Sequence, residues 1–345
     1  KGKLGPGQII AIDLKKGKLF KDKEIKDFLA KDYKKYNKQI IDLEKKISSQ
    51  DEKPNFFSED VKKRQYLSGL SIEDLELILH PMAEEGKEAS GSMGDDTPVA
   101  VLSSHFRPVS HYFRQNFSQV TNPPIDSLRE NKVMSLKTRF GNLGNILDFD
   151  NLTQENIYVL DSPILTNSQF KKFKKFFSKK IKVIDCTFDI EKSLKERIES
   201  IREEAETAVR EGSTCLILSD KDISNQKASI PSILTVGAIH SHLVKHGLRG
   251  YCSLNVECSD AMDTHSFAIL IGVGATTVNP YLAIDSIYQR FEKKLFGKSD
   301  FQTCVSKFKK SIDAGLLKIM SKMGISVISS YRGGCNFEAV GLSRA

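Results

Sequence analysis

His242 and His246 are the pair of side chains in this sequence best spaced to hold a metal ion. They lie four residues apart in a segment, 231–246, whose apolar spacing predicts a helix, so both imidazoles share one face. Two imidazoles on one helix face could supply two of the ligands of a zinc site. Because no acid or thiol completes the set locally, we expect ordinary helix histidines near a domain contact and predict no metal ligand.

Cys252 and Cys258 are six residues apart, which is the spacing of the first two cysteines in one iron–sulfur ligand pattern. The surrounding apolar run predicts a strand over 251–258, and a regular strand would separate the two thiols by about 20 Å on one face. They would then not share a cluster. The sequence has six cysteines in 345 residues, which is unlike the dense disulfide framework of a small secreted domain and indicates a reducing compartment.

Other short patterns support no catalytic assignment. Gly272-Val273-Gly274 lacks the third glycine of a dinucleotide fingerprint and follows a predicted helix, so it predicts a tight turn into the next strand. Asp95 and Asp96 are adjacent, and adjacent side chains of an extended loop point in opposite directions, which argues against a general acid and base pair. The sequence has no Gly-x-Ser-x-Gly elbow and no phosphate-binding P-loop.

The second half of the sequence alternates between predicted strands and helices. Strands are predicted at 181–188, 214–218, 251–258 and 275–278. A predicted helix follows each of them, at 194–211, 231–246, 264–273 and 281–291. Because parallel neighbours need crossover helices, four such units in series predict an α/β fold with a parallel sheet. We expect a helical N-terminal part followed by a half-barrel-like parallel βα repeat, with an open doubly wound sheet as the alternative.

The first half of the sequence predicts a hairpin, helices and two unusual loops. Residues 8–20 read as a β-hairpin, 24–46 as helices, and Ser71 begins a helix that we expect Pro81 to end. The long loop over 84–98 is of the kind that often has a function. A second loop, over 120–126, is stiffened by two prolines.

The lysine-rich run 171–180 predicts an amphipathic helix. Phe170, Phe173 and Phe177 share one face, and lysines occupy the other. We interpret the lysines as a solvated helix face rather than a phosphate-binding surface.

The composition is that of a globular chain without a membrane or nucleic-acid partner. Hydrophobic residues make up 39% and charged residues 28%, enough to bury a large core. No apolar run reaches the length of a membrane span, and the charged first residues do not form a secretory signal. The net charge of +8 arises from 52 basic and 44 acidic residues, a mixture rather than a cationic tail. Both ends of the sequence suggest a segment of a longer polypeptide.

Several unusual loops together closely resemble the large subunit of glutamate synthase. Two of them are Ser-Met-Gly-Asp-Asp-Thr-Pro at 92–98 and Gln-Val-Thr-Asn-Pro-Pro-Ile-Asp at 119–126. Further runs that carry the resemblance lie at 4–8, 129–130, 133–136, 141–145, 162–165, 236–240, 278–283 and 315–326. They extend in order over nearly the whole sequence, which makes the resemblance far more specific than any short motif above.

The resemblance implies a position within a larger enzyme. In that family a glutaminase domain leads into a central domain and then into an FMN barrel with a 3Fe-4S cluster. By correspondence, 1–20 would be the tail of the glutaminase domain, 21–150 the helical part of the central domain with long loops, 151–295 its βα-repeat part, and 296–345 the connector to the FMN barrel. The FMN, the cluster and any FAD would bind outside this segment, so we assign it no catalytic or cofactor-binding residue and expect it to be inactive alone.

The implied function is that of a non-catalytic connecting domain in an oxidoreductase that makes L-glutamate from L-glutamine and 2-oxoglutarate. The implied partners are the glutaminase and FMN-barrel domains of the same chain and reduced ferredoxin. We favour ferredoxin over NAD(P)H because the richness in Lys, Ile, Asn and Phe suggests an AT-rich plastid genome, and we expect the plastid stroma, or otherwise the cytoplasm. The alternative is a free-standing α/β binding protein or enzyme with an unidentified small ligand, which would use the loop at 93–97 and the turn at Gly272.

Gly94, Asp96 and Thr97 are candidates for lining an ammonia channel. In the family that this sequence resembles, ammonia must travel from the glutaminase site to the synthase site, and the central domain lies on that path. Gly94 allows close backbone approach, and Thr97 offers a small side chain with one hydroxyl. It is equally consistent with the sequence that 95–97 cap a following helix, and both interpretations stay open.

Overall fold

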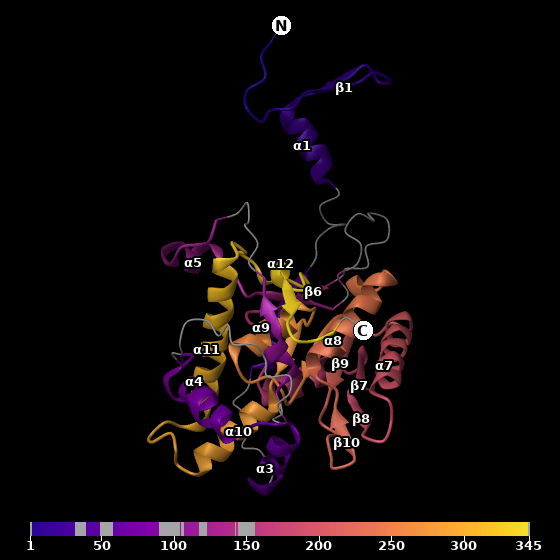
Figure 1. The fold of residues 1–345 in the computed structure, drawn as a ribbon. Helices are drawn as coiled ribbons and strands as arrows, with labels where there is room; N and C mark the ends of the chain where they lie inside the picture. The colour runs from indigo at the N-terminus through magenta and orange to yellow at the C-terminus, as the bar shows by residue number, and fades with distance from the viewer. Residues whose placement is uncertain are drawn as a thin grey trace. The chain divides into compact units, whose positions relative to one another are not determined.

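The computed structural model describes residues 2–31, 39–48, 58–89, 104, 107–116, 123–141, 143 and 156–343. The chain divides into two compact units, Lys1–Ile40 and Ile41–Ala345. In the first unit, β1 (Ala11–Asp13) and β2 (Lys18–Phe20) pair antiparallel and α1 (Asp22–Ala30) follows (Figure 1). This confirms the predicted hairpin.

A parallel sheet forms the centre of the second unit. Its strands are β7 (Ile181–Asp185), β9 (Cys215–Ser219), β11 (Ser253–Glu257) and β12 (Thr277–Asn279). They stand in the order β12-β11-β9-β7 with parallel pairing throughout. Ile164 adds a parallel bridge to Val278 of β12. Within the described part of the chain the sheet does not close into a barrel, so the predicted α/β class is confirmed with an open sheet.

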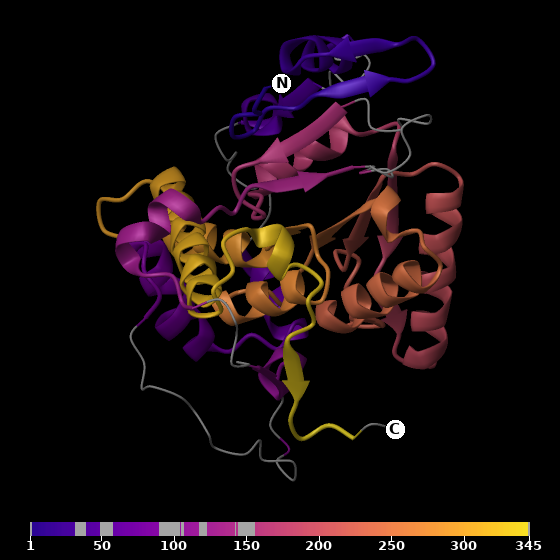
Figure 2. The ribbon, with the colours of Figure 1, turned by 90° about the horizontal axis from the view of Figure 1, so that it is seen from above.

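Both faces of this sheet are covered by helices. Helices α7 (Leu194–Arg210), α8 (Ser232–Lys245) and α9 (Thr264–Gly272) connect successive strands. Leu216 and Leu218 of β9 share one core cluster with these helices. The alternate residues Cys215 and Ile217 belong to a second cluster with α6 (Asn167–Phe176) and α2 (Leu43–Ile47). Figure 2 shows α6 and the layer of α7 to α9 on opposite sides of the strands. Burial on both faces explains why β9 is apolar along its length.

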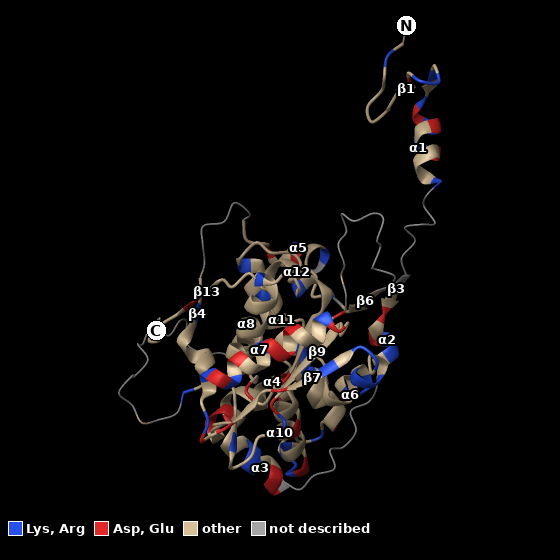
Figure 3. Ribbon diagram, turned by 90° about the vertical axis from the view of Figure 1, so that its right-hand side faces the viewer, with Lys and Arg blue, Asp and Glu red and all other residues tan. Residues whose placement is uncertain are grey.

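Helix α6 has the amphipathic character that the sequence predicts. Phe170, Phe173 and Phe177 are buried, whereas most of the intervening lysines are exposed. Figure 3 shows the Lys residues of α6 in blue. Thr166 begins the helix as part of a capping box with Gln169, which supplies partners for backbone N–H groups at the helix start.

The remaining elements surround the sheet or form small sheets of their own. The other helices are α3 (Ser58–Leu67), η2 (Asp74–Leu79), α4 (His80–Glu85), η3 (Val109–Tyr112), α5 (Ser127–Val133), η4 (Arg249–Tyr251), α10 (Tyr281–Glu292), α11 (Phe301–Lys322) and α12 (Ile328–Tyr331). The other strands are β3 (Gln39–Asp42), β4 (Phe113–Gln115), β5 (Thr138–Phe140), β6 (Asn156–Leu160), β8 (Thr187–Asp189), β10 (Lys227–Ser229) and β13 (Phe337–Ala339). They form the sheets β3-β6-β5, β10-β8 and β13-β4. No described helix combines the length and apolar character needed to cross a membrane.

Two predictions of secondary structure, one in each half of the sequence, are wrong in part. Residues 24–46 are not helical throughout, because Gln39–Asp42 form strand β3. Ile40 and Ile41 are β-branched and favour a strand once β6 is beside them. Similarly, 181–188 is not one strand, since it divides into β7 and β8 and the latter pairs with β10 instead of joining the parallel sheet.

Pro81 does not end its helix, contrary to expectation. Ser71 and Asp74 exchange hydrogen bonds in the predicted cap, and the helix begins with the π-helical segment η2. The backbone N–H of His80 bonds to the carbonyl of Leu75, five residues back. This wider turn accommodates Pro81 in the first turn of α4, which continues until Gly86 ends it with φ of 72°.

Candidate functional site

The residues singled out in the two unusual loops lie largely outside the described part of the chain. Gly94, Asp96 and Thr97 are among them, and so is the first half of the 120–126 loop. Its last residue, Asp126, caps α5 by accepting hydrogen bonds from the backbone N–H groups of Leu128 and Arg129 at 3.0 Å each.

The glycine turn and the paired cysteines have the structural roles that the sequence predicts. Gly274 lies in the turn between α9 and β12 with φ of 125°, and a Cβ there would lie 2.3 Å from Nδ1 of His240. Cys252 and Cys258 stand immediately before and after β11, both buried. The strand therefore separates the two thiols, as the argument against a shared cluster requires.

Polar side chains gather at the carboxyl ends of the parallel strands. Ser219 and Asp220 end β9, Glu257 ends β11, and Asn279 ends β12, all buried. Ligands of open α/β sheets bind at this edge. None of these residues belongs to a catalytic or ligand-binding motif that is recognisable in the sequence. The available signal was an acid within three residues of the end of an apolar strand, at Asp220 and Asp260.

Glu257 is held in a closed ion cluster at this edge. Its carboxylate accepts hydrogen bonds from Lys174 at 3.0 Å, from Lys221, whose Nζ lies 2.8 Å away, and from the Ser219 hydroxyl at 2.8 Å. Burial alone would raise the pKa of Glu257, but the two lysines outweigh it and lower the pKa overall. Glu257 is therefore ionised and fully partnered, which is the environment of a structural carboxylate.

Asp220 and Asp260 are two further acids at this edge, and their surroundings differ from those of Glu257. Oδ2 of Asp220 accepts hydrogen bonds from Ser229 Oγ at 3.1 Å and from the backbone N–H and hydroxyl of Ser259 at 3.0 and 2.7 Å. Burial and the nearby Asp260 raise the pKa of Asp220 to about 6. Asp260 accepts a hydrogen bond from the Ser232 N–H in the first turn of α8. Oδ1 of each acid is buried without a hydrogen-bond partner among the described residues.

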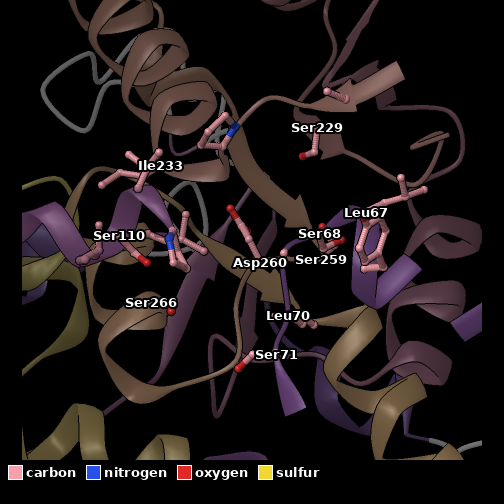
Figure 4. A pocket seen from close by; sticks show the side chains of 18 residues that line it. Leu67, Ser68, Leu70, Ser71, Ser110, Ser229, Ile233, Ser259, Asp260 and Ser266 are labelled. Atoms are coloured by element: carbon pink, nitrogen blue, oxygen red, sulfur yellow. The ribbon is translucent and has the colours of Figure 1, made fainter. Parts of the chain in front are cut away.

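A cavity of about 750 Å³ opens beside the Asp220–Asp260 pair. Its wall is mainly apolar and includes the polar residues Asp260, Ser259, Ser229 and Ser68 (Figure 4). The cavity is also lined by residues 66–67, 69–71, 108–110, 228, 231, 233, 266 and 269–270. A cavity of this size with a few convergent polar groups suits a small organic ligand.

The four cysteines at the ends of the parallel strands are not activated nucleophiles. Burial, followed by the charges of nearby aspartates, raises the pKa values of the Cys186 and Cys258 thiols far above their usual range. Burial also raises the pKa values of Cys215 and Cys252 to about 11. These thiols stay protonated at neutral pH, so they act as buried apolar groups and not as nucleophiles or metal ligands.

Comparison with known proteins places these features in a family context. Residues 63–343 match the family described as glutamate synthase central domain. The chain is 53% identical over its whole length to the glutamate synthase [NADPH] large chain of Azospirillum brasilense and 40% identical to that of Bacillus subtilis. It is 38% identical, over 99% of its length, to the ferredoxin-dependent glutamate synthase of Pyropia yezoensis. The chain spans 22–23% of the length of these relatives.

Proposed function

This chain belongs to the glutamate synthase family, where it corresponds to the central domain, and we propose that it is the non-catalytic connecting domain of an enzyme making L-glutamate from L-glutamine and 2-oxoglutarate. The match over 63–343 carries the proposal, because it is specific to the central domain. The buried, protonated thiols of Cys186 and Cys258 at the carboxyl ends of the strands support a role without covalent chemistry in the described part.

The proposed function assigns the parts of the chain to parts of a longer enzyme. Residues 1–20 are the end of the glutaminase domain, and 296–345 lead into the FMN barrel. The stretch between them is the central domain, with a helical part over 21–150 and the βα repeat over 151–295. The FMN, the 3Fe-4S cluster and any FAD bind to other parts of that enzyme, and none of the described residues is assigned to them.

Separate expression tests this assignment. The 345-residue chain should carry no stoichiometric flavin and should show neither glutaminase nor synthase activity. The complete polypeptide that contains it should convert glutamine and 2-oxoglutarate to glutamate when a reductant is supplied. A flavin absorbance at one equivalent in the purified 345-residue chain, or a complete polypeptide without glutamate formation, would contradict the proposal.

The relatives support two candidate reductants and two candidate locations. Ferredoxin-dependent relatives include chloroplastic enzymes of Spinacia oleracea and Arabidopsis thaliana, which supports ferredoxin and the plastid stroma. The 53% identity to an NADPH-dependent chain from a bacterium supports NADPH as the competing donor and the cytoplasm as the competing location. An assay of the complete polypeptide with reduced ferredoxin and with NADPH in parallel separates these donors. Ferredoxin remains our prediction, and activity with NADPH alone would overturn it.

Within this function, Gly94, Asp96 and Thr97 are proposed to line the passage for ammonia between the two active sites. Ammonia is a small neutral polar molecule, so a narrow passage needs close backbone approach and short hydrogen-bonding side chains. In the complete enzyme, Thr97→Val should uncouple the two half-reactions, so that glutamine hydrolysis exceeds glutamate formation while added ammonia is still used. Thr97→Ser, which keeps the hydroxyl, should remain coupled. A one-to-one ratio of the two rates in Thr97→Val would show that Thr97 is structural.

A further inference from the structure

Three side chains capable of binding a metal ion meet between helices α7 and α8. Glu206 comes from α7, and His242 and His246 come from the end of α8. Glu206 Oε2 lies 2.6 Å from Nε2 of His242 and 3.7 Å from Nδ1 of His246. One ligand atom from each of the three residues lies within 4.8 Å of the other two. Glu206 thus supplies the acid that the sequence does not provide near the histidine pair.

We propose that Glu206, His242 and His246 form a binding site for a zinc-class divalent transition-metal ion. Ligand atoms about 2.0–2.1 Å from a tetrahedral metal are about 3.3 Å from one another. The separations of Glu206 Oε2 from Nε2 of His242, 2.6 Å, and from Nδ1 of His246, 3.7 Å, bracket this value. Two imidazoles and one carboxylate suit zinc, cobalt, nickel or copper, whereas calcium and magnesium prefer oxygen ligands alone.

One neighbouring side chain orients one of the three ligands. Arg210 donates to Oε1 of Glu206 at 2.8 Å, which leaves Oε2 for the metal, and together with His242 it holds the pKa of Glu206 below the usual range. Nδ1 of His246, the atom that lies 3.7 Å from Glu206, also lies 2.9 Å from the backbone carbonyl of His242. A metal bound at Nδ1 must therefore replace this contact with the carbonyl. His246 is exposed, so an ion can enter from solvent.

Arg202 is the group that opposes metal binding. Its guanidinium lies 3.3 Å from Nδ1 of His242, which must then be the unprotonated nitrogen, so the proton sits on Nε2 and is donated to Glu206. A metal at Nε2 requires that proton to move to Nδ1, where Arg202 no longer has an acceptor. Arg202 must therefore swing away, and this rearrangement weakens the site. The same contacts without a metal are a helix-to-helix ion pair, which is the rival explanation.

Metal titration separates the two explanations. The 345-residue chain, purified without a polyhistidine tag, is titrated with Zn²⁺ by calorimetry and with Co²⁺ by visible absorption, where nitrogen and oxygen ligands give a d–d band. We expect one equivalent to bind. His242→Ala, His246→Ala and Glu206→Gln should each weaken binding at least tenfold, while His111→Ala, a histidine outside the cluster, should leave it unchanged.

Replacing Arg202 gives a second test with the opposite sign. Arg202→Gln offers an amide oxygen to the Nδ1 proton, so Zn²⁺ affinity should rise by a factor of about 10, the scale of such outer contacts. A helix-to-helix ion pair alone predicts no gain. The proposal is wrong if Zn²⁺ binds no better than millimolar to folded protein, or if His246→Ala binds it as tightly as the unaltered chain. Circular dichroism spectra establish that each variant is folded.

Discussion

Replacing Gly315 with alanine should destabilise the second unit, although alanine is the better helix former. Gly315 lies inside α11, where that helix packs on α9. A Cβ at this position would lie 2.4 Å from Cγ2 and 2.6 Å from Oγ1 of Thr264, the buried first residue of α9. Contacts this short force the two helices apart or push Thr264 out of its rotamer.

The expected size follows from two opposing effects. Overpacking in a filled core costs about 1–3 kcal/mol. Alanine in place of glycine in a helix interior contributes about 1 kcal/mol of stability in return. The net loss in the free energy of unfolding for Gly315→Ala should therefore be about 1 kcal/mol, and at most about 2.

Gly237→Ala is the matched control because, among the described residues, no atom outside the local backbone of α8 lies within 4 Å of the added Cβ. It should gain the helix preference, about 1 kcal/mol, without a clash. Adding Thr264→Ala to Gly315→Ala should recover stability, since it removes both nearest atoms and Thr264 Oγ1 has no hydrogen-bond partner in the described part of the chain. Urea unfolding followed by circular dichroism measures all four proteins. If Gly315→Ala is as stable as Gly237→Ala, the close approach of α9 and α11 is wrong.

Three further outcomes are expected. Because Cys335 is exposed and the other five thiols are buried, a thiol reagent should label one cysteine quickly in the native chain and none in Cys335→Ser. Fast labelling of Cys186, Cys215 or Cys252 in the native chain would contradict the strand assignments. Burial raises the pKa of Asp285 from 3.8 to about 7, so its contribution to stability is complete below pH 4 and is lost as pH rises toward 7. Urea titrations of Asp285→Asn at several pH values should therefore show a fall of the unfolding free energy with pH that is smaller by up to about 1.4 kcal/mol per pH unit. An unchanged slope would refute the burial of this carboxyl group. Gly274→Ala should lower the urea midpoint more than Gly247→Ala. Both glycines have a positive φ, but of the two only Gly274 would bring an added Cβ against the His240 ring. Equal losses would show that the His240 ring moves aside without cost.

The βα repeat was predictable because its signals are local. Apolar strands, apolar stripes and the glycines at the helix ends, such as Gly212 and Gly247, all lie within single elements. Strand β3 was missed because Ile40 and Ile41 fit a helical spacing equally well, and only pairing with β6 decides between the two. The π-helical segment before Pro81 cannot be recognised from the spacing of apolar residues. Because of this segment the helix continues at a position where a proline usually ends one.

The two clusters of polar residues differ in how far the sequence anticipates them. Asp220 directly follows β9 and Asp260 lies three residues after β11, so the rule for parallel sheets was sufficient to place them at one edge. Glu206 and His242 are 36 residues apart on different helices, and their contact depends on the rotation of α7 against α8. No local spacing encodes that rotation. The histidine pair was therefore visible in the sequence, while its third partner was not.

The bridge between Ile164 and Val278 also has a consequence for the order of folding. Strands β7, β9, β11 and β12 follow one another in the same order along the chain and across the sheet, so each pairing closes one crossover. The 163–165 segment instead joins β12 across the whole repeat, and the hydrogen bond from Asn279 to Leu165 spans 114 residues. Closing so long a loop costs more chain entropy than closing each crossover. We expect the four strands to assemble first and this edge to attach last, so substitutions at Asn279 should accelerate unfolding without slowing refolding.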